Sequence, residues 1–194
     1  CLQQRGEYLY VAEGQEGMQA YDIANIGHKG FSERFVTAPF SPLGHDARVE
    51  SKNATCVALP TNQLVRPERN RDSIEKRPED LEQPMHPVYS YAAVTDAEEG
   101  LILVNVETLG DFEARNNFLS RAITWNPDGV LDGARHAHFS GHHLYVSADS
   151  GIVVVDLDDP VGRLRQDRHR RLRLLQWYRH GGRRLHRRQR HPEL

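Results

Sequence analysis

Apolar and polar positions alternate over short stretches of residues 1–160, and turns rich in glycine, proline and acidic residues separate these stretches. Short runs rich in aromatic and β-branched residues are typical of β-strands. Such runs stand at residues 7–12, 32–37, 47–51, 55–59, 119–125 and 134–139, and the NPDG sequence at 126–129 is typical of a turn. No stretch before Pro160 shows the period of an amphipathic helix. The pattern therefore predicts an all-β body.

One strand–turn–strand unit occurs three times in this body. Tyr8–Gly27 aligns without a gap on Tyr91–Gly110, at an offset of 83 residues, and Leu144–Pro160 repeats the plan with one residue fewer. The equivalent positions are Gly17, Gly100 and Gly151 at the turns, and Asp22, Asn105 and Asp156 at the ends of the second strands. Glycine supplies the positive φ that a tight reversal requires. A recurring unit of this size predicts a repeat protein.

Both strands of the third copy, in LYVSA and GIVVVD, are almost continuously apolar. Strands that are buried on both faces have this character, whereas strands with one solvated face alternate between apolar and polar residues. We therefore expect neighbouring sheets to cover both faces of the third copy.

The third copy also carries a family resemblance. Its GIVVVDLDDP sequence at Gly151–Pro160, with Tyr145, Val146 and Asp149 just before it, closely resembles the LVIVD-repeat family of bacterial β-propeller proteins. The other two copies look like weaker versions, so the resemblance covers about residues 1–160. It implies an incomplete β-propeller of repeated four-stranded blade-like sheets, roughly three or four in number. It also implies a non-enzymatic interaction or binding scaffold that works outside the cytoplasm, with a protein as one kind of partner.

Two departures from the family pattern bear on domain organisation. The second unit is interrupted by a charged excursion at residues 66–87, in which 11 of the 17 residues from Arg66 to Glu82 are charged. Such a stretch buries too little apolar surface to order itself, so we expect a surface loop, either a partner-binding loop or a solvated insertion. It leaves open whether the offset of 83 spans one enlarged blade or two. The last unit stops after its third predicted strand, which together with a start at Cys1 and no signal-peptide pattern predicts a fragment of a longer protein.

Charge separates the chain into two parts. Residues 1–160 hold 13 basic and 25 acidic residues, whereas residues 161–194 hold 12 arginines and two acidic residues. The abrupt change in composition favours a tail that is not native to the fold, as from a shifted reading frame, and that is disordered or irregularly helical. The alternative is a basic arm that binds nucleic acid, with Trp177 and Tyr178 stacking on bases. No apolar run is long enough to span a bilayer.

Histidines supply the strongest candidate chemistry. On a strand, His136 and His138 share one face, and a turn at Ser140 and Gly141 would bring His142 or His143 back beside them. Converging imidazoles suit zinc or copper, so the alternative function is a metal-binding enzyme or redox accessory that uses His136, His138 and His142 with a divalent metal ion. The competing interpretation is that these histidines are exposed polar residues. We predict no organic cofactor, since no nucleotide-binding or nucleophile motif occurs.

The cysteines and the acidic turn residues give little evidence for a metal site. Two cysteines, Cys1 and Cys56, indicate neither a disulfide framework nor a cysteine zinc motif. Acidic residues gather at the hairpin turns, at Glu13, Glu16, Asp96, Glu98, Glu99 and Asp149. A calcium loop requires oxygen ligands at alternating positions, which these turns lack. We therefore expect them to be solubilising hairpin tips.

Overall fold

The computed structural model describes residues 1–23, 47–61, 86–110, 117–160 and 174–178. These residues form three four-stranded antiparallel sheets, and in each sheet the strands follow one another in chain order. The first sheet comprises β1 (Leu2–Arg5), β2 (Tyr8–Ala12), β3 (Met18–Asp22) and β4 (Arg48–Val49). The second comprises β5 (Ala54–Ala58), β6 (Tyr91–Asp96), β7 (Gly100–Asn105) and β8 (Ser120–Trp125). The third comprises β9 (His136–Ser140), β10 (His143–Ala148), β11 (Gly151–Asp156) and β12 (Leu174–Tyr178).

The all-β prediction is confirmed for the described residues, whose only helical elements are short 3₁₀ turns. These are η1 (Pro87–Ser90), η2 (Glu107–Leu109) and η4 (Pro127–Gly129), the last within the predicted NPDG turn. Strands form at five of the six predicted runs, whereas residues 32–37 lie outside the described residues. Strand β1 was not predicted from the sequence. None of the described helical turns has the length and apolar character that a membrane span requires.

Each copy of the repeat forms the central hairpin of one sheet, namely β2–β3, β6–β7 and β10–β11. Asp22 lies opposite Tyr8, Asn105 opposite Tyr91, and Asp156 opposite His143. The three polar residues therefore occupy equivalent register positions at the end of the second strand. Among the described residues, the first two hairpins belong to consecutive sheets in chain order, and no other sheet stands between them. The charged excursion at 66–87 falls almost entirely outside the described residues.

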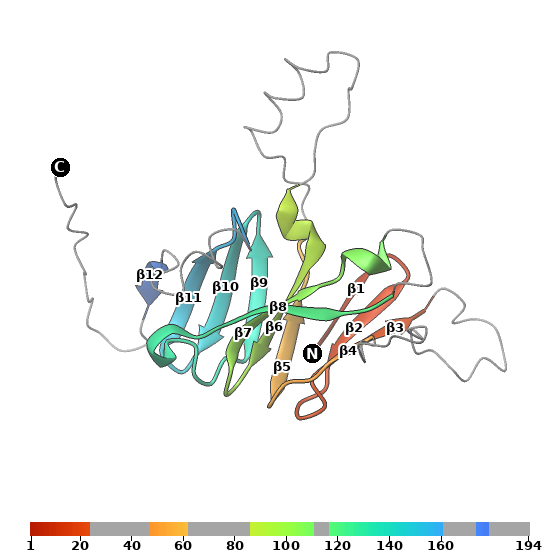
Figure 1. The fold of residues 1–194 in the computed structure, drawn as a ribbon. Coiled ribbons are helices and arrows are strands. Elements are labelled where there is room, and N and C mark those ends of the chain that lie inside the picture. Colours follow the sequence, from red (N-terminus) through yellow and green to blue (C-terminus); the bar gives the residue numbers. More distant parts are fainter. Residues whose placement is uncertain (24–46, 62–85, 111–116, 161–173, 179–194) are drawn as a thin grey trace, which may run out of the picture.

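The second sheet is the middle layer of the structure, with the first and third sheets on its two sides (Figure 1). Successive residues of β7 contribute to different cores. Leu101 and Leu103 pack in the cluster shared with the third sheet, whereas Ile102 and Val104 pack in the cluster shared with the first. All four side chains are at most 1% exposed. The repeat that is covered on both faces is therefore the second copy.

The prediction that the third copy is covered on both faces is wrong. Tyr145 on β10 is 42% exposed and Ile152 on β11 is 46% exposed, while Leu144 and Val153 beside them are buried. The third sheet is one of the two outer layers among the described sheets, so only one of its faces meets the middle sheet. A continuous apolar run indicates that a strand tolerates burial on both faces, but the neighbouring sheets decide whether burial occurs.

Hydrogen bonds join the sheets near their first strands. The Thr55 hydroxyl on β5 donates to the Ala134 carbonyl, 2.7 Å away and just before β9. On the other side, Gly14 and Ala54 form an isolated antiparallel bridge between the β2–β3 turn and β5. Strands β1 and β9 consequently both contact β5. The first strands of the three sheets are therefore neighbours, although each is an edge strand of its own sheet.

The third sheet is completed by a segment of the arginine-rich tail. Strand β12 pairs with β11, with Tyr178 opposite Ile152 and Leu174 opposite Val155. The expectations that the last unit stops after three strands, and that the whole tail is disordered or irregularly helical, are therefore wrong for Leu174–Tyr178. This segment, LLQWY, carries no charge, and the outer edge of β11 offers unpaired backbone groups to any extended apolar segment. The other tail residues lie outside the described part of the chain.

Candidate functional site

Two of the predicted metal ligands, His136 and His138, lie on one face of β9. Exposed and buried residues alternate along this strand, so that both histidines are exposed while Ala137 and Phe139 are buried. The shared face follows from the two-residue period of a β-strand. Across the hairpin, His136 lies opposite Ser147 and His138 opposite Tyr145. The paired strand therefore brings no third imidazole beside them.

The third predicted ligand, His142, lies elsewhere. The tight turn at Gly141, whose φ is 61°, pairs Ser140 with His143 and leaves His142 in the turn itself. There its ring stacks on His86, with centroids 5.8 Å apart, and tilts against His143, with centroids 4.2 Å apart. The predicted set of His136, His138 and His142 is therefore not one of the ligand groups that the described residues bring together.

A pocket of about 230 Å³ opens beside His136 and His138. Its walls come from the first strands of all three sheets and the residues next to them: Cys1, Leu2, Gln3, Val57, Ala58, Leu59, Thr61, His136, Ala137, His138 and Phe139. Most of these side chains are apolar, and the two imidazoles supply its titratable groups. Since the three strand segments are far apart in the chain, the pocket exists only in the folded arrangement of the sheets.

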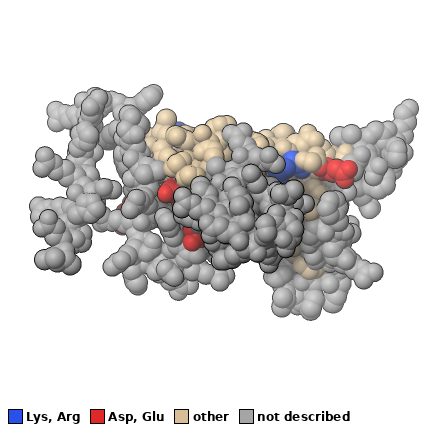
Figure 2. All heavy atoms as spheres, turned by 90° about the horizontal axis from the view of Figure 1, so that it is seen from above, with Lys and Arg blue, Asp and Glu red and all other residues tan. Residues whose placement is uncertain are grey.

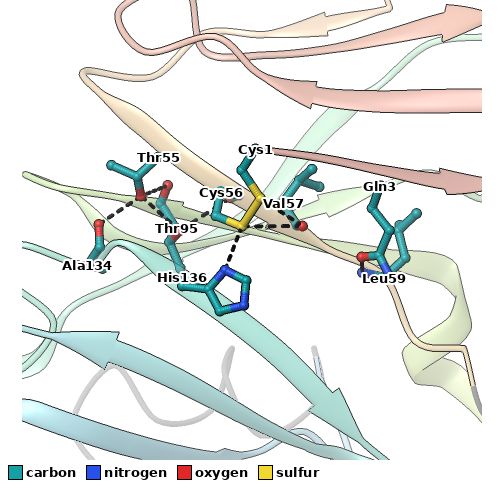
Figure 3. Close-up of a disulfide and its surroundings, with 9 residues drawn as sticks. All are labelled: Cys1, Gln3, Thr55, Cys56, Val57, Leu59, Thr95, Ala134 and His136. Atoms are coloured by element: carbon teal, nitrogen blue, oxygen red, sulfur yellow. Dashed lines mark hydrogen bonds between the residues drawn. A yellow bond between two sulfur atoms is a disulfide. The ribbon is translucent and has the colours of Figure 1, made fainter.

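A disulfide joins Cys1, which lines the pocket, to Cys56 (Figure 3). It links the residue before β1 to β5, across a separation of 55 residues. Cys1 is exposed, whereas Cys56 is 1% exposed. The His136 ring points at the bond from β9, with Nδ1 3.2 Å from the Cys56 sulfur. The sequence interpretation missed this group, because the presence of two cysteines was its only signal.

His86 stacks on His142, and both nitrogens of the His86 ring already have polar partners within the protein. It is 2% exposed and caps η1, where its Nδ1 accepts a hydrogen bond from the Val88 amide at 3.1 Å. The proton of the neutral ring therefore sits on Nε2, which lies 3.3 Å from an Asp158 carboxylate oxygen. A metal ion at Nε2 would require the lone pair that this proton occupies. His86 is accordingly a structural residue.

His142, His143 and Asp156 form a different group, in which one ligand atom from each lies within 4.8 Å of the others. All three side chains are partly exposed, and His142 Nε2 is 3.7 Å from an Asp156 oxygen. Two imidazoles and a carboxylate are ligands that zinc accepts. This group is therefore the place where a predicted ligand, His142, finds partners of the right chemistry.

The acidic hairpin turns are bound to the protein's own donors. Asp96 is fully buried and accepts from the backbone amides of Glu98 and Glu99, both at 2.8 Å, and of Asn53 at 2.6 Å. Burial raises the pKa of Asp96, but these amide hydrogen bonds outweigh burial and hold the pKa below its usual value. An Asp96 carboxylate with these three donors holds the turn in place.

Four of the other turn carboxylates pair with arginines. Arg48 pairs with both Glu13 and Glu16, Arg121 with Glu99 at 2.9 Å, and Arg135 with Asp149 at 2.6 Å. None of these turn residues belongs to a metal-ligand group among the described residues. On the face seen from above, the described surface is mostly uncharged, with small separate acidic and basic patches (Figure 2).

The chain was compared with protein families, curated proteins and solved structures. No family model, no curated protein and no solved structure matches it. The resemblance to LVIVD-repeat proteins therefore rests on the repeat residues themselves.

Proposed function

We propose that this chain is a non-enzymatic β-propeller repeat protein that acts as a binding scaffold, with its binding site in the pocket beside His136 and His138. One observation carries the proposal: the first strands of all three sheets contribute walls to a single pocket of about 230 Å³. Ligand sites are commonly concave, mostly apolar and equipped with a few convergent polar groups. This pocket is concave and combines apolar side chains with two imidazoles, and its lining surface is as polar as it is apolar.

Sheet topology supports the propeller part of the proposal. Each sheet contains four antiparallel strands in chain order, as the blades of a propeller do. In a propeller the first strands of the blades face the central axis, and here β1, β5 and β9 are neighbours that share the pocket. On this interpretation the exposed face of the third sheet, with Tyr145 and Ile152, is the face that a following blade would cover.

The lining indicates the class of ligand. Leu2, which is 63% exposed, and the edges of the buried apolar side chains beside it offer a surface for a hydrocarbon or aromatic group. His136 and His138 lie on one side and offer ring N–H donors to an acceptor group. We propose a small amphiphilic ligand whose apolar part rests against these side chains and whose carboxylate or carbonyl meets the imidazoles.

A pocket-filling substitution tests this function. Thr61 is exposed and lines the pocket, so the indole of Thr61→Trp can occupy it without replacing a core residue. We expect benzoate or phenylacetate to shift the ring NMR signals of both His136 and His138 in the unmodified chain. Thr61→Trp should weaken this binding at least about tenfold, because it takes the space of the ligand.

Lys52→Trp provides the matched control, since Lys52 is also exposed but does not line the pocket. It should bind the two probes as the unmodified chain does. Probe-induced shifts that avoid both histidines, or that persist unchanged in Thr61→Trp, would place binding elsewhere and contradict the proposal.

The disulfide supports a location outside the cytoplasm, which we propose together with the scaffold function. Disulfides persist in oxidising compartments and are rare where thiol reductants are abundant. The Cys1–Cys56 bond adds a structural argument to the location that the family resemblance implies.

A second candidate function is metal binding at His142, His143 and Asp156, favoured by the 4.8 Å grouping of their ligand atoms. In the disulfide-bonded chain, calorimetric titration with zinc should detect one ion. His143→Ala should weaken its binding at least about tenfold, because it removes one of three ligands. His138→Ala, which changes a histidine outside the group, is the control. Equal zinc affinity in His143→Ala and the unmodified chain would exclude this site.

A further inference from the structure

Cys1, Cys56 and His136 form a group of three potential metal ligands beside the pocket, and Cys1 and His136 belong to its lining. The two sulfurs and Nδ1 of His136 all lie within 4.8 Å of one another (Figure 3). The Cα atoms of the cysteines are 4.7 Å apart, so both sulfurs can reach a common point. The residues come from the start of the chain, from β5 and from β9. The folded arrangement of three sheets thus holds the three ligands together.

We propose that reduction of the Cys1–Cys56 disulfide converts this group into a Cys₂His zinc site. Thiolate sulfur and imidazole nitrogen are the ligands that zinc prefers, and zinc binds them in a tetrahedron. At bond lengths of about 2.3 Å to sulfur and about 2.0 Å to nitrogen, the ligand atoms of such a site lie roughly 3.5–3.8 Å apart. The observed separation of 3.2 Å between the Cys56 sulfur and Nδ1 is close to this value. The two sulfurs separate once the bond between them is broken.

The reductant that the proposal requires is a dithiol. One of its thiolates attacks the sulfur of Cys1, the exposed residue of the pair, so that a mixed disulfide forms and the Cys56 thiolate leaves. Nδ1 of His136 lies 3.2 Å from that leaving sulfur and can donate a hydrogen bond to it. The second thiol of the reductant then displaces Cys1. Two electrons and two protons pass to the cysteines, and the reductant becomes a disulfide.

Zinc binding completes the conversion. The ion takes two thiolate sulfurs and one imidazole nitrogen, and the two cysteine thiols release two protons. Its fourth position faces the pocket, because Cys1 and His136 both line it. Water or a ligand in the pocket can occupy that position, and His138 lines the same pocket. Cys1 and Cys56 would therefore be linked by a disulfide bond in the oxidised chain and by a shared zinc ion in the reduced chain. Metal binding by these residues is independent of an organic ligand in the pocket.

Cobalt titration tests the site, since Co²⁺ replaces zinc and reports thiolate ligands by charge-transfer absorption. The full chain is reduced with dithiothreitol under anaerobic conditions, freed of reductant and titrated with Co²⁺, and zinc is then added to displace the cobalt. We expect the thiolate-to-cobalt absorption to saturate at one ion per reduced chain, counted apart from any ion held by His142, His143 and Asp156, and we expect no such absorption from the oxidised chain. His136→Ala should bind cobalt at least about tenfold more weakly.

The substitution is suited to the test because His136 is exposed and its loss leaves the apolar core intact. Ser140→Ala serves as the control, because Ser140 is an exposed residue of the same strand that neither lines the pocket nor belongs to a ligand group, and it should retain the thiolate signal and the cobalt affinity of the unmodified chain. Three results would overturn the proposal: no thiolate-to-cobalt absorption in the reduced chain, unchanged cobalt affinity in His136→Ala, or loss of the β-sheet circular dichroism spectrum on reduction that zinc does not restore.

Discussion

Replacing Gly17 with alanine is expected to lower the free energy of unfolding by about 3 kcal/mol or more, one of the two largest effects of a single substitution that we predict. Gly17 ends the β2–β3 turn with a φ of 82°, a conformation that disfavours a side chain. A methyl group there would also collide with the carbonyl oxygen of Val49 and come within 2.9 Å of the Glu50 Cα atom. Both contacts are with backbone, so no side chain can rotate away.

Gly6 supplies the matched control. Its φ of 60° is also positive, but an added methyl group would meet no atom within 4 Å. Gly6→Ala therefore isolates the conformational cost, which we expect to be about 1–2 kcal/mol. Urea unfolding of the two variants measures the difference. If Gly17→Ala destabilised the protein no more than Gly6→Ala, the close packing of β4 against the turn would be refuted.

Replacing Asp96 with alanine is expected to cost about 3–5 kcal/mol of stability at neutral pH. The substitution deprives three backbone amides, those of Asn53, Glu98 and Glu99, of a buried carboxylate acceptor. It thereby loosens both the β6–β7 turn and the segment that leads into β5. Asp149→Asn is the control, because Asp149 is an exposed turn carboxylate paired with Arg135. We expect its effect to stay below about 1 kcal/mol.

The contribution of Asp96 also sets a pH dependence. Its pKa in the folded chain is below the usual value, because the amide hydrogen bonds outweigh the effect of burial, which alone would raise it. The carboxylate therefore stabilises the fold fully above the unfolded-state pKa of about 3.9, and this stabilisation is lost as the pH falls through the lower folded-state pKa. Asp96→Asn removes the titrating group, so its stability deficit should shrink in acid. Unfolding curves at pH 7 and at several acidic values measure this, and a deficit that stays constant with pH would contradict the assignment.

Local patterns predicted most of the strands because their signals lie within a few residues. The valine-rich runs, the acidic turns and Gly17, Gly100 and Gly151 place the three central hairpins, and these glycines have φ values of 82°, 85° and 119°. The same local reasoning placed His136 and His138 on one face, since strand geometry alone decides that relation. It did not place His142 correctly. His142 lies in the turn and not on the paired strand, because the exact register of the hairpin decides which residues belong to the turn.

What depended on contacts between distant residues emerged only from the tertiary structure. Sequence patterns determined that the chain forms antiparallel hairpins, because the apolar pattern of each strand and the chemistry of each turn act locally. They did not determine that the second sheet is the middle layer. An apolar run shows that a strand can be buried on both faces, but it does not show which sheets will cover it. Nor did they place His136, 80 residues further along the chain, against Cys56. That group exists because the first strands of three sheets meet, and only packing between the sheets brings them together.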